Sequence, residues 1–175
     1  MTAGRPKEAR MKIGVISDTH DHCDNIERFV DAFERERIDQ LIHLGDIVAP
    51  FAAKRFARIA CRVPFYAIYG NNDGERGGLK NVISEWGTIQ DGPIRLQAGG
   101  KVIVAHHYPM AASEVRALFP DADYYLSGHT HESVDRTEGR LRLINPGEAG
   151  GWLTGSVTAG VLTLETDEWR LIRFE

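Results

Sequence analysis

Histidine, aspartate and asparagine gather in a few short stretches of this 175-residue chain, which contains 7 histidines. The stretches are Ser17-Asp-Thr-His20, Gly45-Asp46, Gly70-Asn-Asn-Asp73, His106-His107 and Gly128-His-Thr-His131. Taken alone, each has an ordinary interpretation as a turn, a helix cap or a solvated loop. Imidazole, carboxylate and amide groups are also the groups that bind metals and move protons. The question is whether the fold brings the stretches together.

If they meet, the side chains form a metal site, because carboxylates packed against imidazoles without a cation would be costly to bury. Oxygen and nitrogen ligands without thiolate favour Mn, Fe, Zn, Co or Ni. The candidates outnumber the four ligands of one tetrahedral zinc and suit two ions about 3.5–4 Å apart that share a carboxylate. The candidates are at least two aspartates, one asparagine and four histidines. His43 lies within an apolar run, where we expect a structural hydrogen bond.

The first half of the chain alternates predicted strands and helices. Three short apolar runs, at 12–17, 40–44 and 64–69, each end at one of the polar stretches. A helix is predicted from Asp24 to Ile38, and another begins at Pro50 with Phe51, Ala52, Phe56 and Ile59 on its apolar face. This alternation indicates parallel strands. Because parallel sheets bind ligands at the carboxyl ends of their strands, the three stretches are expected at one edge.

The second half is richer in strand signals. Predicted strands cover 93–96, 101–105, 124–126, 141–144, 156–164 and 168–174, with a short helix at 110–119. Turn residues at 99–100, 138–139 and 166–167 indicate hairpins. The strands at 101–105 and 124–126 lead into the two remaining histidine stretches. We predict an α/β fold in which residues 11–175 form one domain with two sheets and outer helices, after a disordered arm at 1–10.

Composition excludes several classes of protein. The formal net charge is −4, so no overall field favours nucleic acid or anionic membranes, and no stable nucleic-acid complex is expected. No run approaches the roughly 20 apolar residues of a membrane span, and the polar N-terminus lacks a signal-peptide pattern. We therefore expect no membrane association and a cytoplasmic location. The 2 cysteines exclude a disulfide framework. The oligomeric state stays open, a homo-oligomer included.

The motif series D-x-H, G-D, G-N-x-D, H and G-H-x-H resembles the calcineurin-like metallophosphoesterase superfamily. The short length and the Asn145-Pro-Gly147 segment resemble its small bacterial and archaeal phosphodiesterase branch. The resemblance spans Met11 to about Glu148. It implies a four-layer α/β/β/α sandwich with two mixed sheets, the metallo-dependent phosphatase fold. It also implies a hydrolase that acts on a small-molecule phosphoester, as a phosphodiesterase in the first place.

The resemblance also assigns roles to the ligands. Asp18, His20, Asp46 and His131 would bind one divalent ion, and Asp46, Asn71, His106 and His129 the other. Asp46 would bridge the two, and Asp73 matches an acidic position that orients its neighbours. Manganese is the first expectation for both ions, with Fe, Zn, Co or Ni as alternatives. A hydroxide bridging the dinuclear site would attack phosphorus in line.

Two positions depart from the family pattern. Many members have a histidine directly after the motif asparagine that protonates the leaving group, whereas this chain has Asn72, and an amide is no general acid. His107 or His22 would then be the substitute acid, and Asn72 and His107 are our candidate catalytic positions. The second departure is Glu148, where relatives commonly have serine. The sequence offers no reason for that change.

Other interpretations remain at this stage. A subunit of an endosomal sorting coat has this fold with eroded ligands and serves as a metal-free interaction scaffold. This alternative is disfavoured here because every ligand position holds a competent residue. A purely structural metal site is disfavoured because such sites have closed coordination. Diester, monoester and pyrophosphate substrates share the same metal core. Trp86 and Trp152 have two interpretations, as stacking platforms for a base or as packing residues.

Overall fold

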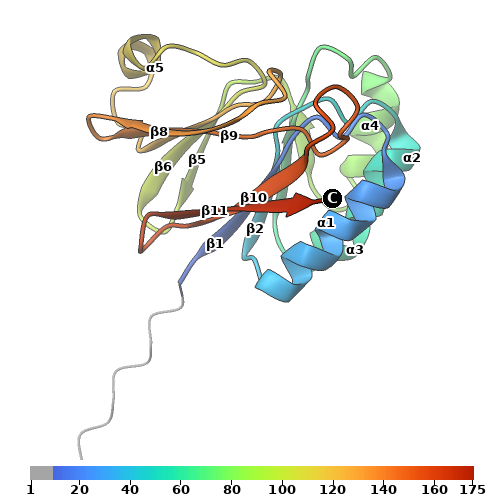
Figure 1. The fold of residues 1–175 in the computed structure, drawn as a ribbon. Helices are drawn as coiled ribbons and strands as arrows, with labels where there is room; N and C mark the ends of the chain where they lie inside the picture. Colours follow the sequence, from blue (N-terminus) through green and yellow to red (C-terminus); the bar gives the residue numbers. More distant parts are fainter. Residues whose placement is uncertain (1–9) are drawn as a thin grey trace, which may run out of the picture.

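The structure is a computed structural model, and it describes residues 10–175 as two facing β-sheets (Figure 1). In spatial order, the larger sheet contains β11 (Glu168–Phe174), β10 (Val157–Thr163), β1 (Lys12–Ile16), β2 (Gln40–His43), β3 (Phe65–Ile68) and β4 (Thr88–Gln90). The smaller sheet contains β5 (Ile94–Ala98), β6 (Lys101–Ala105), β7 (Tyr124–Leu126), β9 (Leu141–Pro146) and β8 (Ser133–Glu138). Both sheets combine parallel and antiparallel pairs, which confirms the mixed topology.

Helices cover the outer faces of the two sheets, as Figure 1 shows. The larger sheet is covered by α1 (Cys23–Glu36), α2 (Pro50–Ala53), the 3-10 turn η1 (Lys54–Phe56), α3 (Ala57–Ala60) and α4 (Arg76–Ile83). The smaller sheet is covered by α5 (Ala112–Leu118). The order of layers is therefore helix, sheet, sheet, helix, as the sandwich expectation required.

Alternation along the strands divides the core into three layers. On β6, Ile103 and Ala105 join the apolar cluster between the sheets, whereas Val104 joins the cluster beneath α5. On β7, Tyr124 faces the space between the sheets and Tyr125 faces outward to α5. Successive side chains of a strand point to opposite faces, so one short apolar run serves two core layers.

Most of the predicted elements are confirmed, with small shifts at their ends. The helix expected at 24–38 covers Cys23–Glu36, and its cap is His22, whose Nδ1 accepts a hydrogen bond from the Asn25 N–H at 3.4 Å. The helix expected from Pro50 is divided into α2, η1 and α3. Phe51 is 56% exposed, because it lies one residue away from the buried i, i+4, i+7 face of Ala52, Phe56 and Ile59.

Three elements were not predicted, and each lacks a strong apolar pattern. The strand β8 is the exposed edge of its sheet, and its sequence Ser-Val-Asp-Arg-Thr-Glu is mostly polar. The helix α4 begins Arg-Gly-Gly, which opposes helix formation, but packing of Leu79 and Ile83 in the core offsets that cost. The strand β4 is only 3 residues long.

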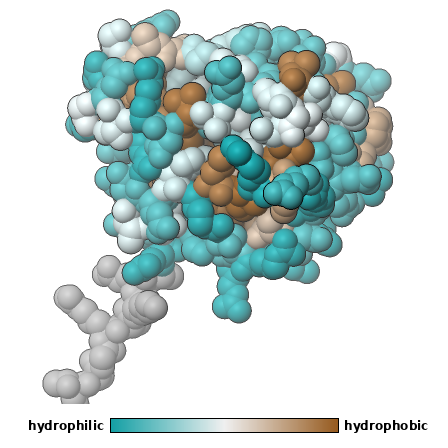
Figure 2. Space-filling model, viewed as in Figure 1, coloured by the Kyte–Doolittle hydropathy of each residue, from teal (hydrophilic) through white to brown (hydrophobic). Residues whose placement is uncertain are grey.

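The surface seen in Figure 2 is largely hydrophilic, with apolar residues in limited patches. Within residues 10–175, no helix is both long and apolar enough to span a bilayer. Residues 1–9 lie outside the described part of the chain, and so does nearly all of the arm expected at 1–10.

Candidate metal centre

The polar stretches meet at the carboxyl ends of β1, β2, β3, β6 and β7. Backbone hydrogen bonds join the loops: the Asp18 N–H donates to the Gly45 carbonyl and the His20 N–H to the Asp46 carbonyl, both at 3.0 Å. The Gly128 N–H donates to the His107 carbonyl, also at 3.0 Å. The His129 N–H donates to Asp18 Oδ2 at 3.0 Å, so the two sheets contribute adjacent loops to one site, although the stretches are far apart in the sequence.

The backbone at this edge is held in an uncommon conformation. Asp18, His20, Asp46, His129 and His131 have φ values of 53°, 39°, 59°, 67° and 62°. Residues other than glycine avoid this left-handed region, at a cost of about 1–2 kcal/mol each. Such strain concentrates at functional sites, where the surrounding structure fixes the geometry. The five residues are all candidate ligands, so the strain supports a role for these loops beyond connecting the strands.

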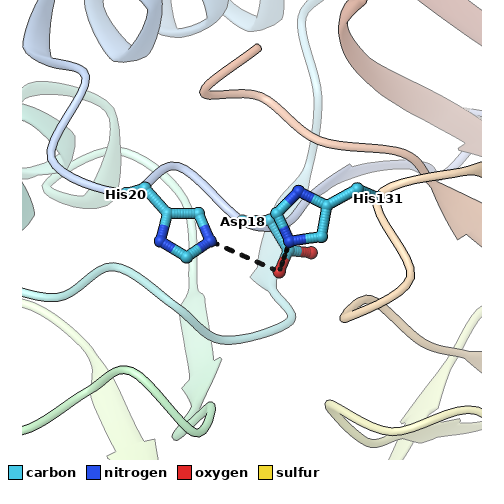
Figure 3. A group of neighbouring side chains, drawn as sticks. All are labelled: Asp18, His20 and His131. Atoms are coloured by element: carbon cyan, nitrogen blue, oxygen red, sulfur yellow. Dashed lines mark ion pairs between the residues drawn. The ribbon is translucent and has the colours of Figure 1, made fainter. Parts of the chain in front are cut away.

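Asp18, His20 and His131 form the first ligand group (Figure 3). Each imidazole points its Nε2 atom at Asp18 Oδ1. The distance between these atoms is 3.9 Å for His20 and 3.5 Å for His131. Asp18 Oδ1 and His20 Nε2 are buried and have no hydrogen-bond partner among the described residues. Burial raises the pKa of Asp18, against the lowering effect of its hydrogen bond from Ser17. A cation between these atoms would satisfy them, so the group fits a metal ion.

Asp46, Asn71 and His107 form the second ligand group, and a carboxylate oxygen of Asp18 also lies within 4.8 Å of the ligand atoms of Asp46 and His107. The Leu44 carbonyl can only accept, so His107 Nδ1 donates to it at 2.8 Å. In the neutral ring, Nε2 then carries a lone pair, yet it lies 2.9 Å from Asn71 Oδ1 and 3.6 Å from Asp46 Oδ2. Three acceptor atoms that face one another also fit a cation. Asp46 Oδ2 lies 3.5 Å from His20 Nε2 as well, so this oxygen lies between the two groups.

The structure places His107 where the sequence led us to expect His106 as a ligand, and it places His106 elsewhere. His107 is buried within the second ligand group, whereas His106 lies outside both groups, with Nδ1 3.4 Å from the Tyr125 hydroxyl. Strand alternation explains this difference, because Ala105 faces the space between the sheets, His106 faces outward and His107 faces inward again. This periodicity was a usable signal in the sequence. Burial lowers the pKa of His106.

The remaining predicted residues surround the two groups. Asn72 donates to both oxygens of Asp46 at 2.8 Å, once from its backbone N–H and once from Nδ2. His129 donates its backbone N–H to Asp18 Oδ2 at 3.0 Å, and its exposed ring lies 5.1 Å from that of His107. His22 caps α1 and packs against Trp152, away from both groups. The structure therefore places Asn72 as a support for Asp46.

Two further side chains brace the loops. Asp73 is buried and accepts backbone N–H groups from Asp46 at 3.0 Å, Gly70 at 2.7 Å and Val48 at 2.7 Å. His43 makes the structural hydrogen bonds expected of it, to Thr19 Oγ1 at 3.1 Å and from the Gly45 N–H at 3.2 Å. Burial lowers the pKa of His43 to about 3, so this ring stays neutral.

Glu148 also reaches the site, although its role could not be read from the sequence. Its buried carboxylate lies 2.6 Å from His131 Nδ1. Burial raises the pKa of Glu148, but hydrogen bonds from Thr154, His131 and Leu153 together bring that pKa below its ordinary value. The signal in the sequence was the departure of Glu148 from the serine expected after Asn145-Pro-Gly147. The sequence alone did not indicate which residue Glu148 contacts.

Comparison with known proteins finds relatives that match most of the chain. A model of the calcineurin-like phosphoesterase superfamily domain matches residues 11–168. A phosphodiesterase of Methanocaldococcus jannaschii is 36% identical over 174 residues, covering 94% of this chain and 100% of that protein. A probable metallophosphoesterase of Methanothermobacter thermautotrophicus is 32% identical over 143 residues, covering 78% and 76% of the two chains.

A solved structure agrees in fold and length. The structure of an archaeal phosphodiesterase superimposes with a TM-score of 0.84 at 38% identity, covering 94% of this chain and all of the other. Only about 6% of the chain lies outside this match.

Proposed function

Because the chain belongs to the calcineurin-like phosphoesterase superfamily, we propose that it is a metal-dependent phosphodiesterase acting on a small phosphoester. The relative at 36% identity is named a phosphodiesterase, which supports the diester as the preferred substrate class. The proposal rests above all on two buried atoms, Asp18 Oδ1 and His20 Nε2, which have no hydrogen-bond partner in the described part of the chain. They lie beside the converging acceptors of the second ligand group.

Two divalent ions fit these residues, with Mn²⁺ first among the candidates. Asp18, His20, Asp46 and His131 would hold one ion, and Asp46, Asn71, His107 and His129 the other. We thus assign His107 to the ligand position first expected for His106. When bound, the ions would supply positive charge against the phosphoryl oxygens and lower the pKa of a water molecule to make it a nucleophile at neutral pH.

The side chains around the ions divide the remaining work. Asn71 faces His107 through its carbonyl oxygen, which leaves the Nδ2 group of Asn71 free to donate to a phosphoryl oxygen. Asn72 holds Asp46 in place through two hydrogen bonds and supplies no proton. With His107 as a ligand and His22 capping α1, neither histidine is available as the substitute acid. We therefore expect efficient cleavage only of esters whose leaving group departs without protonation.

The experiment combines metal analysis with a turnover assay. Purified protein is analysed by inductively coupled plasma mass spectrometry and assayed on bis(p-nitrophenyl) phosphate with added Mn²⁺, with p-nitrophenyl phosphate as the monoester comparison. We expect bound divalent metal and faster turnover of the diester. Asp46→Asn should lose both, whereas Asp24→Asn, on the exposed start of α1, should keep both. Wild-type protein with neither metal nor turnover would favour the interaction scaffold instead.

A further inference from the structure

Glu148 lies between a metal-ligand candidate and a surface loop, and its carboxylate contacts both. Oε2 lies 2.6 Å from His131 Nδ1. Oε1 accepts hydrogen bonds from the backbone N–H of Thr154 at 2.5 Å, from its Oγ1 at 2.7 Å and from the Leu153 N–H at 3.1 Å. The side chain has no exposed surface. A buried carboxylate with donors on both oxygens is fully satisfied, so it holds each of its partners in one place.

On the His131 side, the contact decides which ring nitrogen carries the proton. An ionised carboxylate only accepts, so Nδ1 of His131 must donate to Glu148. In the neutral ring, Nε2 is then free of hydrogen, and Nε2 is the atom that faces Asp18 Oδ1 at 3.5 Å. A hydrogen bond behind a ligating imidazole fixes its tautomer and its orientation.

On the loop side, the same carboxylate fixes the segment that contacts the other histidine of the first ligand group. Trp152 lies one residue before the tethered Leu153 and donates from Nε1 to the His20 carbonyl at 3.2 Å. The Trp152 ring also lies 4.8 Å from that of His22 and is 63% exposed. The buried Glu148 carboxylate therefore contacts His131 directly and is linked to His20 through the loop.

We propose that Glu148 is a positioning residue that presents His131 Nε2 to the first ion and fixes the 152–154 loop beside His20. The ion in this statement rests on the proposed function, whereas the tautomer and the loop do not. A serine at this position would have a single oxygen on a shorter side chain. It cannot accept from His131 and from the loop across the span that the two carboxylate oxygens cover.

The variant Glu148→Gln separates the two contacts. One end of the amide must accept from the two backbone N–H groups of the loop, because those groups cannot accept themselves. The NH2 end then faces His131 and donates to Nδ1, which moves the ring proton to Nε2. We expect the loop to stay fixed and the tautomer to invert. Glu148→Ser should lose both contacts.

Three measurements test the proposal. In metal-free protein at about pH 8, long-range ¹⁵N–¹H NMR should show the neutral His131 ring with Nδ1–H in the wild type and with Nε2–H in Glu148→Gln. Mn²⁺ affinity from calorimetry should fall about 10–100-fold in Glu148→Gln. Amide exchange at Leu153 and Thr154 should stay near the wild-type rate in Glu148→Gln and rise in Glu148→Ser. The control Thr154→Val touches the loop side only and should leave Mn²⁺ affinity within about twofold.

An Nε2–H tautomer in the wild type would overturn the proposal, and this result needs no variant to fold. Unchanged Mn²⁺ affinity in a folded Glu148→Gln would overturn it as well. If wild-type protein binds no metal, the proposed function fails. The tautomer and the amide exchange still decide whether Glu148 positions His131 and the loop, so the two failures are distinguishable.

Discussion

The two ligand groups lie at the same sheet edge but differ in how their ligand atoms are satisfied. In the first group, Asp18 Oδ1 and His20 Nε2 have no hydrogen-bond partner within residues 10–175. In the second, Asp46 Oδ2 accepts a hydrogen bond from Asn72 Nδ2 at 2.8 Å, although the lone pair of His107 Nε2 faces Asn71 Oδ1. An ion gains contacts at Asp18 and His20 without competing with any hydrogen bond there, whereas at Asp46 it must share Oδ2 with the amide of Asn72. We therefore expect the first group to bind its ion more tightly.

The difference follows from how each group is built. All three members of the first group sit on backbone held in the left-handed region, and Glu148 fixes His131 from behind. In the second group, Asn71 and Asn72 are exposed residues of a turn. A rigid group keeps its buried polar atoms unsatisfied, whereas an exposed turn adjusts until its atoms find partners. Preorganisation for a ligand thus costs more stability in the first group than in the second.

The largest expected effect comes from Asp18→Asn. Both histidines of the first group face the Asp18 carboxylate, so its loss should weaken Mn²⁺ binding there by more than about 100-fold. This effect is larger than the one expected from losing a residue that only supports a ligand. The same change should stabilise the metal-free protein, because a buried carboxylate without a partner on Oδ1 is replaced by a neutral amide that donates to His131 Nε2.

Calorimetry measures the first effect and thermal unfolding the second. A gain of about 1 kcal/mol would raise the Tm of a domain this size by about 2–4 °C. A lower Tm for metal-free Asp18→Asn would contradict the view that this group is strained without its ion.

The next effect distinguishes the two adjacent histidines. His107→Ala should weaken binding of the second ion by about 100-fold, because Nε2 of His107 faces Asn71 and Asp46. His106→Ala serves as the matched control, and it should leave the affinity for each ion within about threefold of the wild-type value. Competition with a metal-binding dye measures both. The reverse pattern would restore the assignment taken from the family resemblance, with His106 as the ligand.

The difference between His106, the expected ligand, and His107, the residue found in the second ligand group, shows how much the sequence could predict. Apolar runs that end in polar residues predicted β1, β2 and β3, and the carboxyl-end rule brought Asp18, Asp46 and Asn71 to one edge. The sequence did not reveal side-chain partners that come from distant loops. Nothing near Glu148 in the chain indicates His131, because the contact depends on the path of the segment between them. Propensity also failed for α4, where burial of its apolar residues overcomes two glycines.

A smaller effect tests why the second group binds more weakly. Asn72→Ala removes the Nδ2 hydrogen bond to Asp46 Oδ2 and leaves the backbone N–H bond to Oδ1. The incoming ion then no longer shares Oδ2 with an amide donor, so its affinity should rise by about 10-fold, the lower end of the value of one hydrogen bond to a charged group. A two-site calorimetric titration should show the two dissociation constants moving closer together. A wider gap would mean that Asn72 supports ion binding by orienting Asp46.

The smallest effect concerns the pH dependence of the metal-free protein. Burial raises the pKa of Asp18 in the folded chain. A group with a raised folded pKa contributes stability below its unfolded pKa, and that stability is lost as the pH rises through the folded pKa. The Tm advantage of Asp18→Asn over the wild type should therefore be full near neutral pH and vanish below about pH 4, where Asp18 is protonated in both states.

Saturating Mn²⁺ should reverse this dependence, because a bound cation lowers the pKa of its carboxylate ligand. The wild type is then the more stable protein at neutral pH, and it loses that advantage as the pH falls. Thermal unfolding from about pH 4 to pH 8, with and without Mn²⁺, measures both curves. If the metal-free advantage of Asp18→Asn grew on acidification, burial would not be the dominant influence on Asp18. The contrast between a strained first group and a relaxed second group would then lose its physical basis.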